Sequence, residues 1–360
     1  MRRHGDGSRP PRHFPIWPAR ERQRAGPPGR RRSHRHLDVP IGADPVKKIL
    51  IDTDPGMDDT LAIILAVKSA EVDVLGISSV AGNYPIDVTT RNALKTLELL
   101  KRTDIPVARG MGKPLARPLA KDPFSHGADG QAEIYLPEPV TAPAARHGID
   151  QIIDTVRGHP GEVTIVTLGP LTNLAMALMK EPSIGPAIRE VVSIAGSFGL
   201  NRYAFANATG DTPQSEWNVF VDPEAAKLVF ESGVPVRAVG IDVATHFDIN
   251  FSEAQLVALR ASPRPEANIV EKMVRFVQGR GFESYCVLID SLAVAAVIDP
   301  SLIGTTRARV GVETRGELTL GQTVADFRHH HAWAHLPEIE VASSANFARF
   351  LELVMQRVLE

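Results

Sequence analysis

Four aspartates stand close together in the stretch Asp52-Thr53-Asp54-Pro55-Gly56-Met57-Asp58-Asp59. An isoleucine-rich run precedes them and a long run of good helix formers follows, which predicts a buried strand, a Pro-Gly turn and a helix. Carboxylates this crowded repel one another unless a cation lies among them or some of them hold protons. Hard oxygen ligands suit Ca²⁺ or Mg²⁺. The stretch therefore predicts a metal and substrate loop, whereas simple helix capping would account for only one or two of the carboxylates.

Three further groups follow predicted strands or begin a predicted helix. Asn83 comes just after one strand, where it could also be an ordinary turn residue. Leu168 ends another strand, and its carbonyl oxygen could bind a hard cation. Asp290 lies near the start of an apolar helix, where a buried carboxylate needs a partner. That partner is either a backbone cap or the same metal ion.

Two other places carry polar side chains with weaker signals. Glu216 and Asn218 flank Trp217, a combination that suits hydrogen bonding to a polyol. His126 lies in a stretch from 113 to 148 without periodicity, and long loops often form active-site walls. A lone loop histidine could meet a leaving group, stack on a ligand or do neither.

The order of the predicted elements indicates how these residues are positioned. Strand patterns alternate with helical ones, which predicts an α/β fold in a single large domain: a mostly parallel open sheet with right-handed crossovers and flanking helices. Residues at the carboxyl ends of such strands meet at one edge, where open sheets bind ligands. The expected strands after the first are 72–80, 105–108, 163–168, 191–195 and 234–239, with two more around Val310 and over 318–324. The later helices are expected over 87–102, from 222 to about 230, over 252–276 and 288–297, and from 345 to the end.

Composition excludes several classes of protein. The 360 residues are 43% hydrophobic, enough for a large core, and 40 basic residues balance 42 acidic ones. No global field therefore points to nucleic acid or a membrane surface, and no stretch has the apolar length of a membrane span. The single cysteine, Cys286, excludes a disulfide framework within the chain and a cysteine-based zinc cluster.

Residues 1–45 differ from the rest of the chain. Arginines stand among prolines and glycines there, with almost no aliphatic residues, so the segment cannot bury enough apolar surface to fold. We expect a disordered Arg- and Pro-rich tail, or an extension from an upstream start codon. A nucleic-acid-binding arm is the alternative, and no function is assigned to the tail.

The aspartate stretch resembles the signature of the inosine-uridine-preferring nucleoside hydrolases. The similarity covers about Lys47 to the C-terminus. It continues through Gly82-Asn83, His126-Gly127, Gly169-Pro170-Leu171-Thr172-Asn173, Glu216-Trp217-Asn218, Asp222-Pro223-Glu224-Ala225-Ala226, Asp290 and Thr314-Arg315-Gly316-Glu317-Leu318. The resemblance implies that 46–360 form a catalytic domain with the Rossmann-like nucleoside hydrolase fold.

The family implies calcium-dependent hydrolysis of the N-glycosidic bond of ribonucleosides to ribose and free base. By resemblance, Asp54, Asp59, Asp290 and the Leu168 carbonyl would bind Ca²⁺, and Asp54 would also be the general base on a metal-bound water, with Asn83 beside it. The expected ribose-binding residues are Asp58, Asp211, Glu216, Trp217 and Asn218. We expect a cytoplasmic homo-oligomer, a dimer or tetramer, which serves nucleoside catabolism and salvage and binds neither nucleic acid nor membrane.

Three positions depart from the family pattern. The usual His-Asp pair reads Ile289-Asp290, so the histidine that protonates the leaving base in many members is missing. The Met-Gly-Gly stretch reads Ile194-Ala195-Gly196, and the Gly-Asn before Thr-Pro reads Gly210-Asp211. His126 is then the nearest candidate for a leaving-group acid. The base preference stays open.

Two other classes of function compete with a nucleoside hydrolase. Aspartate-nucleophile phosphatases also carry Asp-x-Asp after a buried strand, but Pro55-Gly56-Met57 breaks their pattern. The second alternative is a ribose- or nucleoside-binding member of the family, non-catalytic or of altered specificity, that has lost its leaving-group acid. Turnover on a panel of nucleosides separates it from a hydrolase.

Overall fold

The fold is described from a computed structural model, which covers residues 45–121, 125–201, 203–328 and 330–360. The expected tail at 1–45 lies outside these residues except for its last one, and it stays a prediction. The described part of the chain contains one sheet. Its strands are Lys47–Thr53 (β1), Val72–Ser79 (β2), Val107–Arg109 (β3), Val163–Thr167 (β4), Glu190–Ile194 (β5), Val236–Val239 (β6), Ile303–Val312 (β7), Thr323–Asp326 (β8) and Glu338–Ala345 (β9).

The sheet has the order β3-β2-β1-β4-β5-β6-β9-β7-β8. The strands from β3 to β9 in this order run parallel, and β7 is antiparallel to both of its neighbours. After β1 the chain builds outward through β2 and β3, and then returns to add β4 on the other side of β1. Ligands bind at such a switch point in open α/β sheets.

Helices cover both faces of the sheet. The longer ones are Met57–Val67 (α1), Ile86–Leu99 (α2), Gly148–Gly158 (α3), Thr172–Lys180 (α4), Pro223–Glu231 (α7), Glu253–Ala261 (α9), Pro265–Gly279 (α10), Ile289–Ile298 (α11) and Phe347–Leu359 (α12). The shorter ones are Tyr203–Ala206 (α5), Trp217–Val221 (α6) and Ile241–Ala244 (α8), with 3-10 turns at Pro182–Ala187, Ser284–Val287, Pro300–Leu302 and His331–Trp333.

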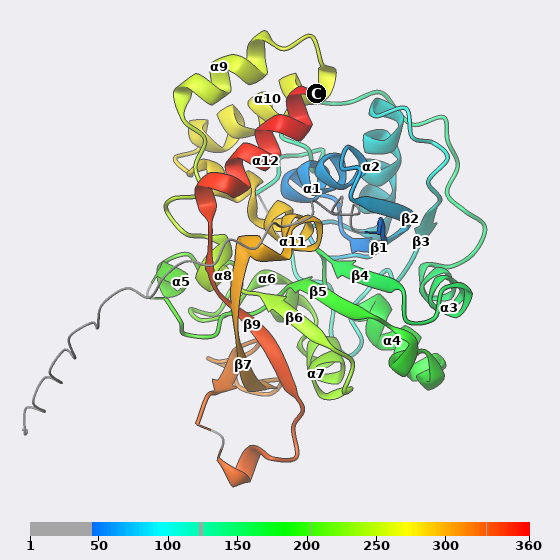
Figure 1. Ribbon diagram of the computed structural model, residues 1–360, viewed down its shortest axis with the longest axis vertical. Helices are drawn as coiled ribbons and strands as arrows, with labels where there is room; N and C mark the ends of the chain where they lie inside the picture. Colours follow the sequence, from blue (N-terminus) through cyan, green and yellow to red (C-terminus); the bar gives the residue numbers. More distant parts are fainter. Residues whose placement is uncertain (1–44, 122–124, 202, 329) are drawn as a thin grey trace, which may run out of the picture. The chain divides into compact units, whose positions relative to one another are not determined.

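Two apolar cores lie on the two sides of the sheet. Figure 1 shows α1, α2, α10, α11 and α12 on one face and α3, α4 and α7 on the other. Leu61, Leu292 and Phe350 belong to the first core, and Leu174 and Phe230 to the second. Because α1 and α11 are both buried along their length and pack on each other, the carboxylates at their first turns are carried into the interior.

The α/β fold with a mostly parallel sheet is confirmed, and several local predictions need correction. The helical segment expected over 252–276 is two helices, because Pro265 begins α10 after a break at 262–264. The strand expected over 318–324 begins only at Thr323, and the residues before it form turns. Strand β9 and helix α3 were not predicted.

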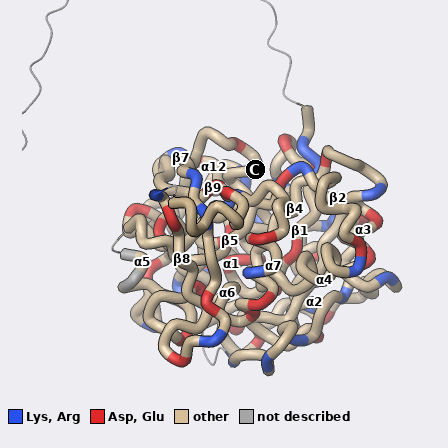
Figure 2. Tube along the Cα trace, turned by 90° about the horizontal axis from the view of Figure 1, so that it is seen from below, with Lys and Arg blue, Asp and Glu red and all other residues tan. Residues whose placement is uncertain are grey.

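Charges of both signs are interspersed over the described residues, as the trace in Figure 2 shows. Many of them form ion pairs at the surface, such as Lys48 with Glu162. Among the helices that the structure describes, none is long and apolar enough to cross a lipid bilayer.

Candidate active site

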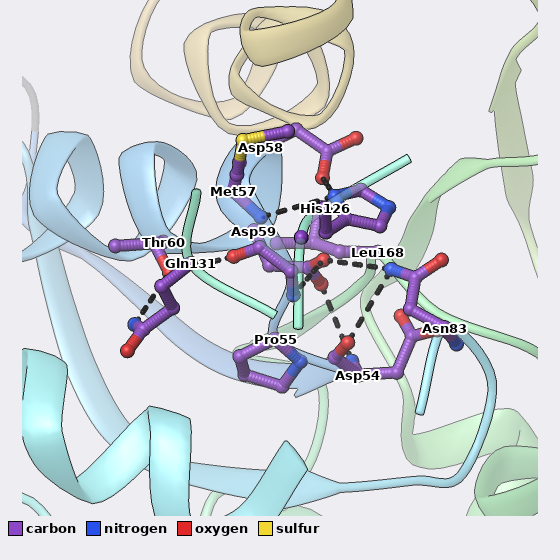
Figure 3. Close-up of polar contacts among 12 residues, drawn as sticks. Asp54, Pro55, Met57, Asp58, Asp59, Thr60, Asn83, His126, Gln131 and Leu168 are labelled. Atoms are coloured by element: carbon purple, nitrogen blue, oxygen red, sulfur yellow. Dashed lines mark hydrogen bonds and ion pairs between the residues drawn. The ribbon is translucent and has the colours of Figure 1, made fainter. Parts of the chain in front are cut away.

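The predicted site residues of the aspartate loop lie at the switch point of the sheet. Asp52 at the end of β1 is paired with Thr167 of β4, so Asp54 and Leu168 leave the sheet side by side. Asn83 follows the next strand, β2, and its backbone N–H donates a hydrogen bond of 2.6 Å to Asp54 Oδ2. Figure 3 shows Asp54, Asn83 and Leu168 together with Asp58, Asp59 and His126. The topology therefore brings the early and middle parts of the chain to one place.

Asp54 is fully buried, and its second oxygen, Oδ1, has no hydrogen-bond partner in the described structure. Two glycines make room for this carboxylate. A Cβ on Gly169 would lie 2.5 Å from Asp54 Oδ1, and a Cβ on Gly82 would overlap Asp54 Oδ2. An unpaired buried acceptor costs about 1–3 kcal/mol, so the position favours a ligand at Oδ1.

Asp59 both caps α1 and belongs to a cluster of carboxylates. It accepts hydrogen bonds from the backbone N–H groups of Gly56 (3.0 Å) and Asp54 (3.2 Å) and from the hydroxyl of Thr53. Oxygens of Asp58, Asp59 and Asp290 also lie within 4.8 Å of one another, all three in buried side chains. Asp59 can therefore cap α1 and still be part of the carboxylate cluster.

Burial and mutual repulsion govern the protonation of this cluster. Burial, with the charges of Asp58, Asp59 and Asp54, holds the pKa of Asp290 well above its ordinary value. Burial and the charge of Asp59 do the same to the pKa of Asp54. Burial together with Asp58 raises the pKa of Asp59 to about 6. Without a cation, such carboxyl groups hold protons in order to share the space.

Oxygen donors of this kind and number fit a hard divalent cation. The fit rests on two observations, the unpartnered Asp54 Oδ1 and the cluster of three carboxylates. The Leu168 carbonyl faces the same region but accepts a hydrogen bond of 2.7 Å from Asn218 Nδ2. The structure thus brings Asp59 and Asp290 together with Asp58, places the unpartnered Asp54 oxygen on the same loop, and bonds the Leu168 carbonyl to Asn218.

Glu216 and Asn218 lie at the first turn of α6. Glu216 caps this helix through the backbone N–H groups of Asn218 and Val219, and it also accepts from Gly196 N–H. Burial raises the pKa of Glu216 to about 7, although these hydrogen bonds oppose the shift. Asn218 also donates to the Ile194 carbonyl at 3.1 Å, so it bridges the ends of β4 and β5.

His126 reaches the aspartate loop from the long connection before α3. Its Nδ1 accepts a hydrogen bond of 3.2 Å from the Met57 backbone N–H and lies 3.6 Å from Asp58 Oδ1, as Figure 3 shows. An Nδ1 that accepts from an amide leaves the ring hydrogen of the neutral imidazole on Nε2. His126 is thus a buried part of the site, although the sequence marked it only as a loop residue.

Most of the predicted residues line one cavity of about 320 Å³. They are Asp58, Asn83, His126, Leu168, Asp211, Glu216, Trp217, Asn218 and Asp290. Asp211 is an exposed member of this lining. Asp54 and Asp59 do not line it, since both are fully buried.

The rest of the cavity wall was not predicted. Ile241, Phe282, Cys286 and Ile289 form an apolar part of it, and burial raises the pKa of the Cys286 thiol to about 12. Lys121, Ser125, Ile194 and Thr209 complete the lining. Ile194 and Ile289 stand at two of the positions where the sequence departs from the family pattern. No motif marked Lys121, Thr209, Ile241, Phe282 or Cys286, and only the closeness of Phe282 and Cys286 to the Asp290 helix could have suggested those two.

A switch-point site with buried carboxylates and a cavity of this size defines a class, the α/β enzymes that bind small polar ligands at the edge of the sheet. The sequence profile described as "Inosine-uridine preferring nucleoside hydrolase" matches residues 49–352. The chain belongs to this family of N-glycosyl hydrolases.

Individual relatives agree with this assignment. The pyrimidine-specific ribonucleoside hydrolase RihA of Escherichia coli O7:K1 is 37% identical over 316 residues, which are 86% of this chain and 97% of RihA. A plant nucleoside hydrolase has a similar structure, with a TM-score of 0.78 and 31% identity, covering 88% of this chain and 99% of its own. The purine-preferring ribonucleoside hydrolase of Gardnerella vaginalis has a TM-score of 0.78 and 29% identity, with coverages of 87% and 98%.

Proposed function

We propose that this chain hydrolyses the N-glycosidic bond of ribonucleosides to ribose and free base, with Ca²⁺ as its metal and Asp54 as its general base. The observation that carries the proposal is the buried carboxylate group of Asp54, Asp58, Asp59 and Asp290, with an unpartnered oxygen, beside a nucleoside-sized cavity. The similarity to RihA, a named ribonucleoside hydrolase, supports it.

Asp54, Asp59, Asp290 and the Leu168 carbonyl are the proposed calcium ligands, and Asp58 stands close enough to the other two clustered carboxylates to join them. When bound, such an ion neutralises the carboxylates and eases deprotonation of a water molecule. For the Leu168 carbonyl to serve, its hydrogen bond from Asn218 has to lengthen or be shared. Carbonyl oxygens have two lone pairs, so sharing is chemically available.

In the proposed reaction a water molecule adds to C1′ of the ribose while Asp54 takes its proton. The C1′–N bond breaks, its electron pair stays on the base nitrogen, and the base takes up a proton. Asp58, Glu216 and Asn218 hold the ribose hydroxyls, with Trp217 and Asp211 on the same cavity wall. Carboxylates around the anomeric carbon favour the positive charge that develops on the sugar ring in the transition state.

His126 is the proposed donor to the leaving base, because Ile289 cannot supply a proton. The side chain lines the cavity, and to act as the acid it is protonated on both nitrogens, with Nδ1–H turned toward Asp58 Oδ1, 3.6 Å away, in place of the bond from Met57 N–H. Nε2 then gives its proton to the base and the ring returns to the neutral imidazole. General acid catalysis of this kind contributes about 10²–10⁴-fold to the rate.

A non-catalytic nucleoside binder is the second candidate, and one observation favours it. The wall formed by Ile241, Phe282 and Ile289 offers no acidic hydrogen to a departing base. A panel of purine and pyrimidine ribonucleosides, assayed with Ca²⁺ for release of both ribose and base, separates the two. Turnover of at least one nucleoside is expected, whereas binding without release of base would favour the second candidate.

A further inference from the structure

The turn that carries His126 has a strained backbone with a built-in support. Positive φ angles occur at Gly127, Gly130, Ala132, Glu133 and Tyr135, and for residues with a side chain this conformation is costly. The carboxylate of Asp129 accepts hydrogen bonds of 2.8 Å from the backbone N–H groups of Gln131, Glu133 and Tyr135. The backbone N–H of Ala132 closes the turn onto the His126 carbonyl at 2.8 Å. These hydrogen bonds therefore hold the backbone of residues 126–135 in one conformation despite its strain.

One side chain joins this turn to the aspartate loop. Asn92, buried on α2, donates from Nδ2 to the Pro55 carbonyl at 3.0 Å and to the Asp129 carbonyl at 3.1 Å. A side-chain amide has two hydrogens, and each is used here on a different segment. Pro55 follows Asp54 directly, and Asp129 lies three residues after His126, so Asn92 ties together the backbones of the two segments.

The aspartate loop and the turn that carries His126 pack so closely that the imidazole has little room to move. A Cβ on Gly56 would lie 2.6 Å from His126 Nδ1, so the imidazole lies directly against the backbone of the aspartate loop. Gln131 Nε2 adds a hydrogen bond of 3.0 Å to the Thr60 hydroxyl on α1, visible in Figure 3. A hydroxyl can rotate to follow its partner, whereas the two carbonyls bound by Asn92 are fixed in the backbone. Asn92 is thus the more direct determinant of the spacing.

We propose that Asn92 is a positioning residue: its amide holds the Pro55 and Asp129 backbones at a fixed separation and so sets where the His126 imidazole stands relative to Asp58. Asn92 does not line the cavity and acts only through these backbones. The proposal rests on the proposed function, because the position of His126 matters only if the site hydrolyses nucleosides.

The test is a double-mutant cycle of Asn92→Ala and His126→Ala, assayed on an ordinary ribonucleoside and on one with an activated aryl leaving group. Misplacement of a catalytic group by about 1 Å can cost on the order of 10²-fold. We expect Asn92→Ala to lower kcat on the ordinary nucleoside tenfold or more, with a small change in KM and a small loss on the activated substrate. In the His126→Ala background, Asn92→Ala should cause no further loss of kcat.

Asn268→Ala is the matched control. Asn268 also donates both amide hydrogens to backbone carbonyls, those of Leu259 (3.1 Å) and Ser262 (2.9 Å), but at the junction of α9 and α10. This variant should lose thermal stability without loss of kcat. If Asn92→Ala does not fold, the cycle is run with Asn92→Asp, which keeps the shape and carries at most one hydrogen, and which should also lower kcat.

The outcomes distinguish the two proposals. Equal losses from the Asn92 change with and without His126, or equal losses on both substrates, overturn the role of Asn92 while hydrolysis itself stands. A wild-type kcat in the Asn92 variants also overturns the role of Asn92. A wild-type enzyme that binds nucleosides but releases no base overturns the proposed function, and the role of Asn92 falls with it.

Discussion

Asp54 belongs to the aspartate loop, and His126 packs against the other end of this loop from the connection before α3. Asp54 ends the strand side and keeps an unpartnered oxygen, while His126 lies on the helix side against Gly56 and Met57. The proposed base and the proposed acid thus come from two segments that contact each other at Gly56 and Met57. In the proposed mechanism His126 supplies the proton that Ile289, at the position of the family histidine, cannot supply.

At the scale of single residues, the first prediction concerns the sugar. Asp58, Glu216 and Asn218 should distinguish ribose from deoxyribose, because a buried acceptor left unpaired by a missing hydroxyl costs about 1–3 kcal/mol, or roughly 5- to 150-fold in kcat/KM. Steady-state assays of matched ribo- and 2′-deoxyribonucleosides measure the ratio. Equal kcat/KM values would contradict the proposed ribose contacts.

The second prediction concerns the leaving group. His126→Ala should lower kcat on ordinary nucleosides by about 10²-fold or more, and much less on a nucleoside with an activated aryl leaving group that needs no proton. Initial rates on both substrates give the comparison, and equal losses would mean that His126 only positions the ligand. Ile289→His is the complementary variant. A gain in purine or pyrimidine turnover is expected from it if this position limits the rate.

At the scale of elements, the strand–turn–helix unit of β1 and α1 could be predicted because its local signals agree. The apolar run, Pro55-Gly56 and the helix formers after Met57 all indicate the same structure. This unit and the alternation of strands and helices together predicted that the site lies at the carboxyl edge of the sheet. Polar residues at strand ends and in loops, together with the family resemblance for Asp211, identified nine of the residues that line the cavity.

The features that the sequence did not indicate depend on contacts between segments that are far apart in the chain. Asn92 sits on a helix in an unremarkable pattern, and only the fold places its amide between Pro55 and Asp129. The positive φ angles of the Asp129 turn likewise have no glycine signal at Ala132, Glu133 or Tyr135. Strand β9 was missed although Pro337 stands directly before it. Its alternation of polar and apolar residues is short, and its pairing with β6 and β7 decides its conformation.

The third prediction concerns the loop between β4 and α4. Gly169→Ala should fold, because its backbone does not need a positive φ, but its methyl group would displace Asp54, whose Oδ1 would lie 2.5 Å from the new Cβ. A loss of both calcium affinity and kcat is expected, measured by titration calorimetry and steady-state assay. Gly279→Ala at the end of α10 is the control, since nothing lies within 4 Å of its Cβ. Wild-type values for Gly169→Ala would contradict the proposed place of the metal.

At the scale of the whole molecule, the site joins parts of the chain that are far apart. Asp59 belongs to the first helix of the fold, and Asp290 to α11, which packs on it. Repulsion among their carboxylates acts against this packing, so a cation that binds only the folded protein should stabilise the entire domain. Binding of a cation at the site and the free energy of unfolding of the domain are therefore linked.

The fourth prediction follows from that linkage. Ca²⁺ at about 100 times its Kd should stabilise the fold by about 2.7 kcal/mol, and a chelator should lower the Tm again. Differential scanning calorimetry measures the shift. Asp290→Asn should abolish most of it, whereas Asp150→Asn, which changes a surface carboxylate paired with Lys180, should leave it intact. A calcium-independent Tm would contradict the proposed metal site.

The central claim, that Asp54 is the general base of a nucleoside hydrolase, is tested most directly by single-turnover release of base from a ribonucleoside in the Asp54→Asn variant. The amide keeps the shape of the side chain and cannot take the proton from water. We expect a chemical step slower by about 10²–10⁴-fold than in the wild type, while the bound nucleoside remains detectable. Release of base at the wild-type rate would contradict it.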